Sequence, residues 1–201
     1  YPDDLKNPKL RRLIEFYDTW YVPNNMALIL VGDFNAEEAK PLIEKTFGRL
    51  QAKPLPVRKV YPQTDFSKDE RFVAKLGYMP MVEIGYKGVP AGNKDELLLD
   101  FVTSLLSNSM QVGLLDKLVL DSKVMYAWAS NDSRRDQGRI ELVAVPYMDA
   151  ATRRYNSLAE AEEVVMTEVE KLVKGDIDTA LVAAVREGFY QQIDRPLEYP
   201  Q

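Results

Sequence analysis

Apolar and polar residues follow two different periods along this chain, and each period predicts one kind of element. Where apolar side chains recur every three or four positions, one face of a helix is apolar, as in Leu5–Trp20, whose stripe ends in aromatic residues. The same spacing predicts further helices over residues 36–50, 95–106, 113–120 and 157–175, and a last one that runs to about Ile193.

Polar residues at the ends of these stripes predict where the helices begin and end. Asn35 is followed three residues later by Glu38, and Ser157 is followed in the same way by Glu160. This spacing is typical of a capping box, in which two side chains satisfy backbone N–H groups of the first turn. Gly175 predicts the end of the helix that Ser157 begins, because glycine adopts the left-handed conformation common at helix C-termini.

Shorter apolar stretches predict strands. Met26–Val31 is a continuous apolar run between a Pro-Asn-Asn turn signal and Gly32, and such a run suits a strand buried on both faces. Other stretches alternate apolar and polar residues, at least in part, as half-buried strands do. They are Arg71–Tyr78, Met81–Lys87, Val124–Ala129 and Arg139–Val145, of which the last two flank the polar residues 131–138 and predict a hairpin.

The order of these elements predicts an α+β fold. Hairpins and long crossovers occur together, which favours a layer of helices packed on a mixed, mostly antiparallel sheet over a doubly wound parallel sheet. With 201 residues the chain is long enough to bury a sizeable core.

Composition excludes several classes of function. The chain has no histidine and no cysteine, and its formal net charge is −5. Without imidazole or thiolate ligands we expect no catalytic zinc site in this chain, and Ser-His-Asp catalysis is excluded. The acidic balance argues against nucleic acid, which attracts clustered Lys and Arg. The isolated arginine doublets, 11–12, 134–135 and 153–154, are typical of solvated surface.

Few side chains suggest chemistry by their spacing. Tyr126 and Trp128 are two positions apart on one predicted strand, so they share a face of the sheet. Such a pair either packs in the core or, at a rim, contacts a substrate. Adjacent carboxylates such as Glu162 and Glu163 point about 100° apart on a helix, which favours solvated surface. A carboxylate-dependent hydrolase would instead need two acids that converge in a pocket.

One segment is specific enough to indicate a family. An aromatic helix end is followed by Tyr21–Met26 with the sequence Tyr-Val-Pro-Asn-Asn-Met, by Leu30–Phe34 with Leu-Val-Gly-Asp-Phe, and by Ile43–Gly48. This pattern, over Leu5–Leu50, resembles the pitrilysin/insulinase family of zinc metallopeptidases at the start of the domain that follows its metal-binding domain. Downstream, Leu118–Tyr126 is similar to a Leu-Arg element of the family, so the resemblance extends over most of the chain.

The resemblance implies a fold and a place in a larger protein. The fold would be the insulinase or mitochondrial-processing-peptidase-like metallohydrolase domain, as a single domain over residues 1–201 in which a helix over 1–22 leads into an α/β core over 23–201. The chain would be a fragment of a longer protein. The family holds zinc by an inverted His-x-x-Glu-His motif and a distal Glu in the preceding domain. No catalytic residue and no metal ligand is therefore assigned here, and zinc is expected in the preceding domain of the parent protein.

The Leu-Arg element implies one site residue. Its tyrosine is matched by Tyr126, whereas its arginine is replaced by Val119. In family members that bind the substrate backbone with this arginine and tyrosine, the guanidinium supplies hydrogen-bond donors in a fixed planar arrangement. Replacing the arginine by Val119 removes these donors. The resemblance thus implies substrate binding by Tyr126, beside the alternative that this tyrosine packs in the core.

The resemblance also implies a function and its alternative. The first is a non-catalytic, chamber-forming domain of a zinc-dependent metallopeptidase that hydrolyses peptides, inactive as a fragment. Its partners would be the remainder of the parent peptidase and a peptide substrate, with no nucleic acid and no membrane span. The alternative is an interaction or scaffold domain of a family member without peptidase activity. The compartment stays open, and we expect a soluble protein of the bacterial cytoplasm or periplasm.

Overall fold

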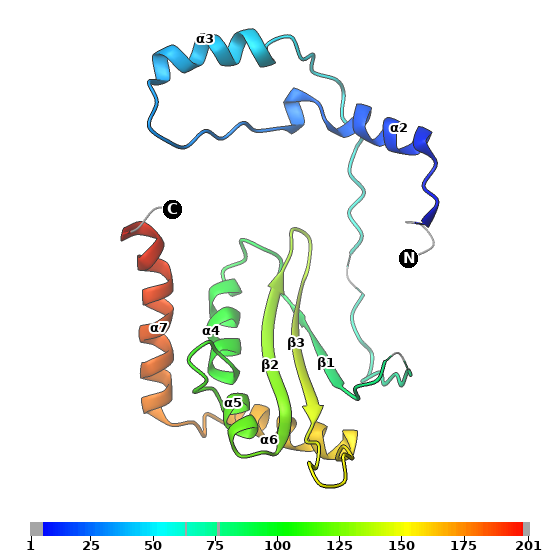
Figure 1. Ribbon diagram of the computed structural model, residues 1–201, viewed down its shortest axis with the longest axis vertical. Coiled ribbons are helices and arrows are strands. Elements are labelled where there is room, and N and C mark those ends of the chain that lie inside the picture. Colours follow the sequence, from blue (N-terminus) through cyan, green and yellow to red (C-terminus); the bar gives the residue numbers. More distant parts are fainter. Residues whose placement is uncertain (1–5, 63, 76, 199–201) are drawn as a thin grey trace. The chain divides into compact units, whose positions relative to one another are not determined.

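The computed structural model describes residues 6–62, 64–75 and 77–198, and the chain divides into two units, Tyr1–Tyr61 and Pro62–Gln201. Figure 1 shows the elements of both units. The larger unit contains the sheet.

A three-stranded antiparallel sheet is the centre of the unit Pro62–Gln201. Its strands are β1 (Val82–Gly88), β2 (Val124–Ser133) and β3 (Gly138–Pro146), and β3 lies between the other two (Figure 1). β2 and β3 form the predicted hairpin, whereas two helices lie between β1 and β2 in the chain. The prediction of helices on a mostly antiparallel sheet is confirmed, and among the described strands both pairings are antiparallel.

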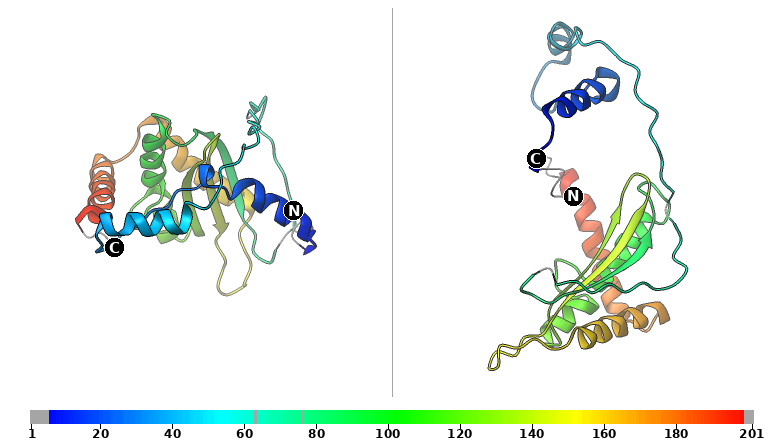
Figure 2. Two further views of the ribbon diagram at one scale, coloured as in Figure 1. Left: turned by 90° about the horizontal axis from the view of Figure 1, so that it is seen from above. Right: turned by 90° about the vertical axis from the view of Figure 1, so that its right-hand side faces the viewer.

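Three helices pack on one face of this sheet. They are α4 (Glu96–Leu106), α5 (Leu114–Leu120) and α6 (Leu158–Lys174), seen beside the strands in Figure 2. Their apolar side chains and those of the strands form one cluster, whose buried members are Leu106, Leu115, Leu118, Val124, Ala127, Leu142, Ala144, Ala161 and Val165. Burial of apolar area stabilises the fold by about 25 cal/mol per Å² removed from water.

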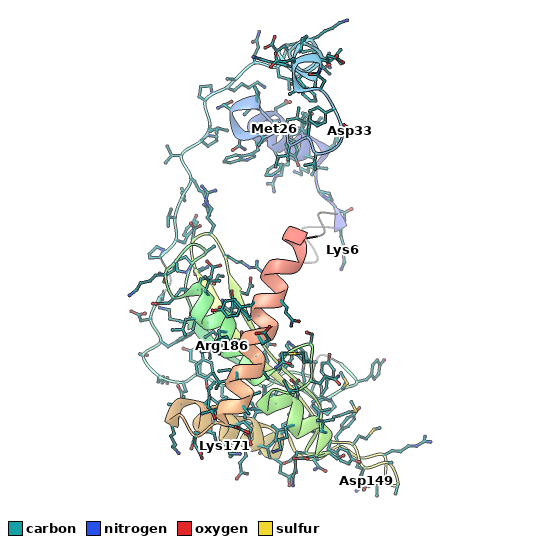
Figure 3. All side chains as sticks on the ribbon, turned by 90° about the vertical axis from the view of Figure 1, so that its left-hand side faces the viewer. Lys6, Met26, Asp33, Asp149, Lys171 and Arg186 are labelled. Atoms are coloured by element: carbon teal, nitrogen blue, oxygen red, sulfur yellow. The ribbon has the colours of Figure 1, made fainter. Side chains whose placement is uncertain are left out.

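The last helix packs on α4. It is α7 (Thr179–Glu198), and the rings of Phe101 and Phe189 meet edge to face between the two helices, with centroids 6.0 Å apart. Val185 of α7 is buried, and Arg186 follows it in Figure 3. In the part of the chain that the structure describes, no helix is both long and apolar enough to cross a membrane.

Both predicted N-caps are confirmed, but of the two predicted capping boxes only that of Ser157 and Glu160 forms, because Glu38 bonds the side chain of Asn35 and not its backbone N–H. Ser157 Oγ accepts a hydrogen bond from the Glu160 N–H, and Glu160 Oε2 accepts one from the Ser157 N–H, each at 3.1 Å, so the capping box of α6 is complete. Gly175 follows α6 in the left-handed conformation, with φ 72°. Asn35 Oδ1 accepts from the Glu37 N–H at 2.9 Å at the start of the second predicted helix. Residues close in sequence make these bonds, so the sequence is sufficient to predict them.

Replacing Ser157 by alanine is expected to destabilise the protein by about 1 kcal/mol, because an N–H of the first turn of α6 loses its acceptor. Urea-induced unfolding followed by circular dichroism measures the change. Glu160→Gln is the matched control, since glutamine also completes a capping box and should cost much less. If both variants lost the same stability, the hydroxyl of Ser157 would not be the main cap of α6.

The unit Tyr1–Tyr61 consists of helical segments and irregular chain. Its segments are α2 (Leu10–Trp20), the 3-10 turn η1 (Pro23–Asn25) and α3 (Ala36–Phe47). α2 begins later than predicted, and Leu5 lies outside the described residues. α3 begins as predicted and ends before Leu50, and it continues through Pro41 although that residue lacks a backbone N–H.

The strand predicted at Met26–Val31 is wrong. Its backbone is irregular, and the side chains of Ile29 and Val31 are 81% and 88% exposed. Figure 3 marks the start of this segment at Met26. A strand needs the backbone groups of a neighbouring strand, and the described residues of this unit form helices and irregular chain only. The apolar run reflects strand propensity, which is not sufficient without an edge to pair with.

The strand predicted at Arg71–Tyr78 is also absent from those of its residues that the structure describes, while Leu76 lies outside them. Phe72 is 85% exposed, so the alternation does not correspond to a buried face. The segment is instead tied to α6 by an ion pair between Arg71 and Glu162. An ion pair between distant residues leaves no periodic signal in the sequence.

The hairpin is longer than predicted. Strand pairing continues through Asn131, Asp132 and Ser133, which sequence analysis assigned to the loop, and the turn is confined to residues 134–137. The Nδ2 of Asn131 donates to Asp100 Oδ1 of α4 at 2.8 Å and to Ser133 Oγ at 3.2 Å, whereas its Oδ1 is buried without a hydrogen-bond partner. The longer strands bring charged residues onto the sheet.

Candidate functional site

The strand residues that alternate with the helix-covered core form a second face of the sheet, because side chains point to opposite sides along a strand. We call this surface the aromatic face. Its members are Tyr126, Trp128, Ser130 and Asp132 of β2, their register partners Val145, Val143, Glu141 and Arg139 of β3, and Glu83, Gly85 and Lys87 of β1.

Tyr126 and Trp128 meet edge to face on this surface, as their spacing predicts. Their ring centroids are 5.2 Å apart, and the planes are inclined by 65°. Tyr126 is 57% exposed, whereas Val143 and Val145, its neighbours across the ladder, are buried. The interpretation of Tyr126 as a core side chain is therefore wrong. The two rings form an apolar surface beside the polar hydroxyl of Tyr126, and this combination is enriched at binding surfaces.

Glu83 and Glu141 place a pair of carboxyl groups on the same face. They lie diagonally across β1 and β3, since Glu83 is in register with Val143. Their mutual hydrogen bond, followed by burial and charge repulsion, holds the pKa of Glu83 above its ordinary value of 4.5. Arg139, whose Nη2 lies 3.5 Å from Glu141 Oε2, opposes this shift. Glu83 therefore retains its proton at a higher pH than an isolated glutamate does.

Replacing Glu83 by glutamine is expected to stabilise the protein at pH 7 but not at pH 4. A carboxyl group whose pKa is higher in the folded state than in the unfolded state stabilises the fold while it is protonated. This stabilisation is complete at a pH below the unfolded-state pKa, and it is lost as the pH rises through the folded-state pKa. Glutamine keeps a donor toward Glu141 at every pH. The gain at pH 7 should be about 0.5 to 1 kcal/mol, because Glu83 is exposed and solvent screens the pair.

Urea unfolding at a series of pH values between 4 and 7 measures this difference. Glu163→Gln, at an exposed position of α6, is the control and should leave the pH dependence of stability unchanged. If the stability of Glu83→Gln declined with pH as steeply as that of the unchanged protein, the shared proton would be contradicted.

The carboxyl pair does not have the geometry of a hydrolase. The two acids of glycosidases lie about 5 to 9 Å apart so that substrate fits between them. Glu83 and Glu141 lie closer together than that, because the interaction with Glu141 that raises the pKa of Glu83 acts only at hydrogen-bonding range. The pair leaves no local pattern in the sequence, because its members are distant in the chain and only the strand register brings them together. The only sign of the pair in the sequence is the alternation of apolar and polar residues within each predicted strand, which places the two carboxyl groups away from the apolar face.

The residues that the structure describes do not suit a zinc ion. Among them, no group of three Asp, Glu, His or Cys side chains could hold a metal, and the whole sequence lacks His and Cys. No step of metal chemistry is therefore assigned to this chain.

Comparison with known families matches residues 9–189 to the domain described as the peptidase M16 inactive domain. Among curated relatives, the zinc protease PqqE of Helicobacter pylori is 30% identical over 191 residues, which are 90% of this chain and 40% of that protein. The probable zinc protease PqqL of Escherichia coli is 41% identical over 51 residues, 25% of this chain and 6% of that protein. The chain thus spans less than half the length of these relatives.

Comparison with solved structures shows the same fold. A protease from Helicobacter pylori matches 99% of this chain and 48% of its own chain, with a TM-score of 0.78 and 24% identity. A putative M16-like peptidase from Alicyclobacillus acidocaldarius matches 95% of this chain and 45% of its own, with a TM-score of 0.66 and 15% identity. The periplasmic protease PqqL from Escherichia coli matches 98% of this chain and 22% of its own, with a TM-score of 0.58 and 16% identity.

Proposed function

We propose, on the premise that this chain belongs to the peptidase M16 family through that family's inactive domain, that it forms a wall of the substrate chamber in a zinc-dependent metallopeptidase. The observation that carries the proposal is the aromatic face, on which the exposed ring of Tyr126 and that of Trp128 lie beside paired carboxyl groups. Rigid strands hold these side chains in place, as a binding surface requires.

The chemistry would then be supplied by the remainder of the parent protein. This chain has no histidine or cysteine, and two of its curated relatives are named as zinc proteases and are more than twice its length. A zinc-binding domain that precedes this chain would cleave the peptide, while the aromatic face helps to hold it. We place the parent in the periplasm, the compartment of the Escherichia coli protease PqqL, and a secretory leader in the parent gene would test this.

A scaffold function is the second candidate, and the exposed apolar side chains of the unit Tyr1–Tyr61 favour it. Leu10 and Phe16 of α2 are 70% and 58% exposed, and apolar surface of this kind is typical of contacts with another protein. The parent gene separates the two candidates. An inverted His-x-x-Glu-His motif in the preceding domain supports the peptidase, and its absence supports the scaffold.

Replacing Tyr126 by alanine in the parent peptidase is expected to raise KM for a peptide about five- to tenfold with little change in kcat. The reason is that the variant loses an aromatic contact worth about 1 kcal/mol, which holds the substrate equally in the ground state and the transition state. Cleavage of a quenched fluorescent peptide measures both constants. Tyr190→Ala is the matched control, because Tyr190 is 58% exposed but lies on α7, and it should leave KM unchanged.

The chain by itself should bind no stoichiometric zinc and cleave no peptide. Metal analysis of the purified chain and a peptide cleavage assay check both. An unchanged KM in the Tyr126→Ala parent would overturn the role of the aromatic face. Zinc uptake by this chain alone, linked to peptide cleavage, would overturn its assignment as non-catalytic.

A further inference from the structure

A small cavity opens where the β2–β3 hairpin turns. Its volume is about 280 Å³, and it is lined by Asp132, Arg134, Gln137, Gly138 and Arg139. The lining contains two guanidinium groups and one carboxylate, and the guanidinium of Arg139 also lies 3.5 Å from the carboxylate of Glu141, which is not part of the lining. We call this cavity the arginine pocket. The doublet of Arg134 and Arg135 is predicted to be solvated surface, and neither residue has a role in the proposed function.

Asp132 positions both arginines of the pocket. Arg134 Nε donates to Asp132 Oδ1 at 3.1 Å and to Oδ2 at 2.9 Å, and Arg139 Nε lies 3.4 Å from the same Oδ2. A guanidinium has five N–H donors, whereas a carboxylate accepts about four hydrogen bonds. Asp132 and Glu141, the second partner of Arg139, together accept about eight hydrogen bonds, fewer than the roughly ten N–H donors of the two guanidiniums. Since Nε of Arg134 faces Asp132, the terminal Nη edge of its planar group faces away from Asp132 and can bind a second acceptor.

Backbone contacts hold the walls of the pocket in place. The Arg134 N–H donates to the Gln137 carbonyl, and the Arg134 carbonyl accepts from the Ala91 N–H, each at 2.9 Å. Gly138 packs so closely that a Cβ there would lie 2.1 Å from the carbonyl oxygen of Val89. These contacts fix the backbone from which the arginines extend, so a bound ligand has to order only their side chains, which are 74% and 55% exposed.

We propose that the arginine pocket binds a carboxylate group of an extended peptide that lies along the aromatic face. Arginine binds carboxylates through two parallel hydrogen bonds. Asp132 and Glu141 would both repel a phosphate dianion more strongly than a monovalent carboxylate. Pockets for drug-sized ligands start at about 300 Å³, so this cavity suits the end of a peptide or one acidic side chain.

The strand geometry predicts the spacing of the peptide. Trp128, Ser130 and Asp132 are every second residue of β2 and lie on one face of it. The ring of Trp128 and the pocket are therefore separated by about four residues, or roughly 13 Å. An extended peptide covers this distance with about four residues of its own. The preferred ligand therefore has an aromatic or large apolar residue about four positions before its carboxylate. This inference rests on the proposed contact between the aromatic face and a peptide.

The test uses the full chain and three acetylated peptides that share a phenylalanine about four positions before the last residue. The first ends in a free carboxylate, the second in an amide, and the third in an amide preceded by glutamate. Calorimetry and changes in amide NMR shifts measure their affinities. We expect the two carboxylate peptides to bind about tenfold more tightly than the neutral amide. Whether the first or the third binds better distinguishes a C-terminal carboxylate from an acidic side chain as the natural ligand.

Arg134→Gln should abolish this preference for carboxylate and leave binding of the neutral amide unchanged. Arg135→Gln is the matched control, because it removes the same charge from the adjacent residue outside the pocket lining, and it should keep the preference. A tenfold preference that persists in Arg134→Gln, or equal affinities of acid and amide in the unchanged chain, would overturn the inference. If none of the peptides binds, or if Tyr126→Ala does not weaken their binding, the proposed function is contradicted instead.

Discussion

Replacing Leu115 by alanine is expected to destabilise the protein by about 2 to 5 kcal/mol. Leu115 of α5 is 0% exposed and belongs to the cluster that joins the helices to β2 and β3. Its removal takes away hydrophobic burial and leaves a cavity that the surrounding strands and helices fill only in part. Urea-induced unfolding measures the loss, which is a large part of the stability of an ordinary domain.

Leu120→Ala is the matched control for this loss. Leu120 lies on the same helix, but it is 70% exposed, so its removal should change stability by less than about 0.5 kcal/mol. Similar losses in the two variants would mean that α5 does not pack on the sheet as described.

Replacing Gly138 by alanine is expected to cost about 2 to 3 kcal/mol, near the upper end of the usual range for overpacking. A Cβ at this position would lie 2.1 Å from the oxygen and 2.8 Å from the nitrogen of Val89. These are backbone atoms, so the clash cannot be relieved by a side-chain rotation. The chain after β1 must move away from the hairpin. Thermal and urea unfolding measure the loss.

Gly85→Ala is the matched control, because Gly85 also lies in the sheet but a Cβ there meets no atom within 4 Å. It should be close to neutral. The Gly138→Ala variant should also lose the preference for carboxylate peptides, since Gly138 lines the arginine pocket. A fully stable Gly138→Ala variant would contradict the close approach of Val89.

Sequence analysis predicted most helices well because their signals are local. The capping box of Ser157 and Glu160, the left-handed Gly175 and the cap at Asn35 involve neighbours in the chain, and all are confirmed. The apolar stripes of α4, α5 and α6 were recognised for the same reason, since period and burial coincide when a helix has one covered face. The pattern around Pro-Asn-Asn-Met was equally local, and the family match over residues 9–189 confirms the resemblance.

Strands were predicted less reliably because a strand is stable only beside another strand. Met26–Val31 has a stronger apolar signal than β1, but it forms no strand, whereas β1 pairs with β3 along its whole length. The polar residues Asn131 and Asp132 extend β2, because pairing with β3 and contacts with α4 outweigh their low strand propensity. Pairing partners are distant in sequence, so local patterns do not identify them.

The sequence by itself determined the helices with their caps, the α+β class, the family, and the shared face of Tyr126 and Trp128. The tertiary structure alone decided that Tyr126 is exposed, that Glu83 meets Glu141, and that two arginines share Asp132 at a small pocket. The physical reason is the range of the interactions. Caps and helical stripes are made by residues a few positions apart, whereas exposure, shared protons and pockets depend on the register between strands that the chain joins only through long connections.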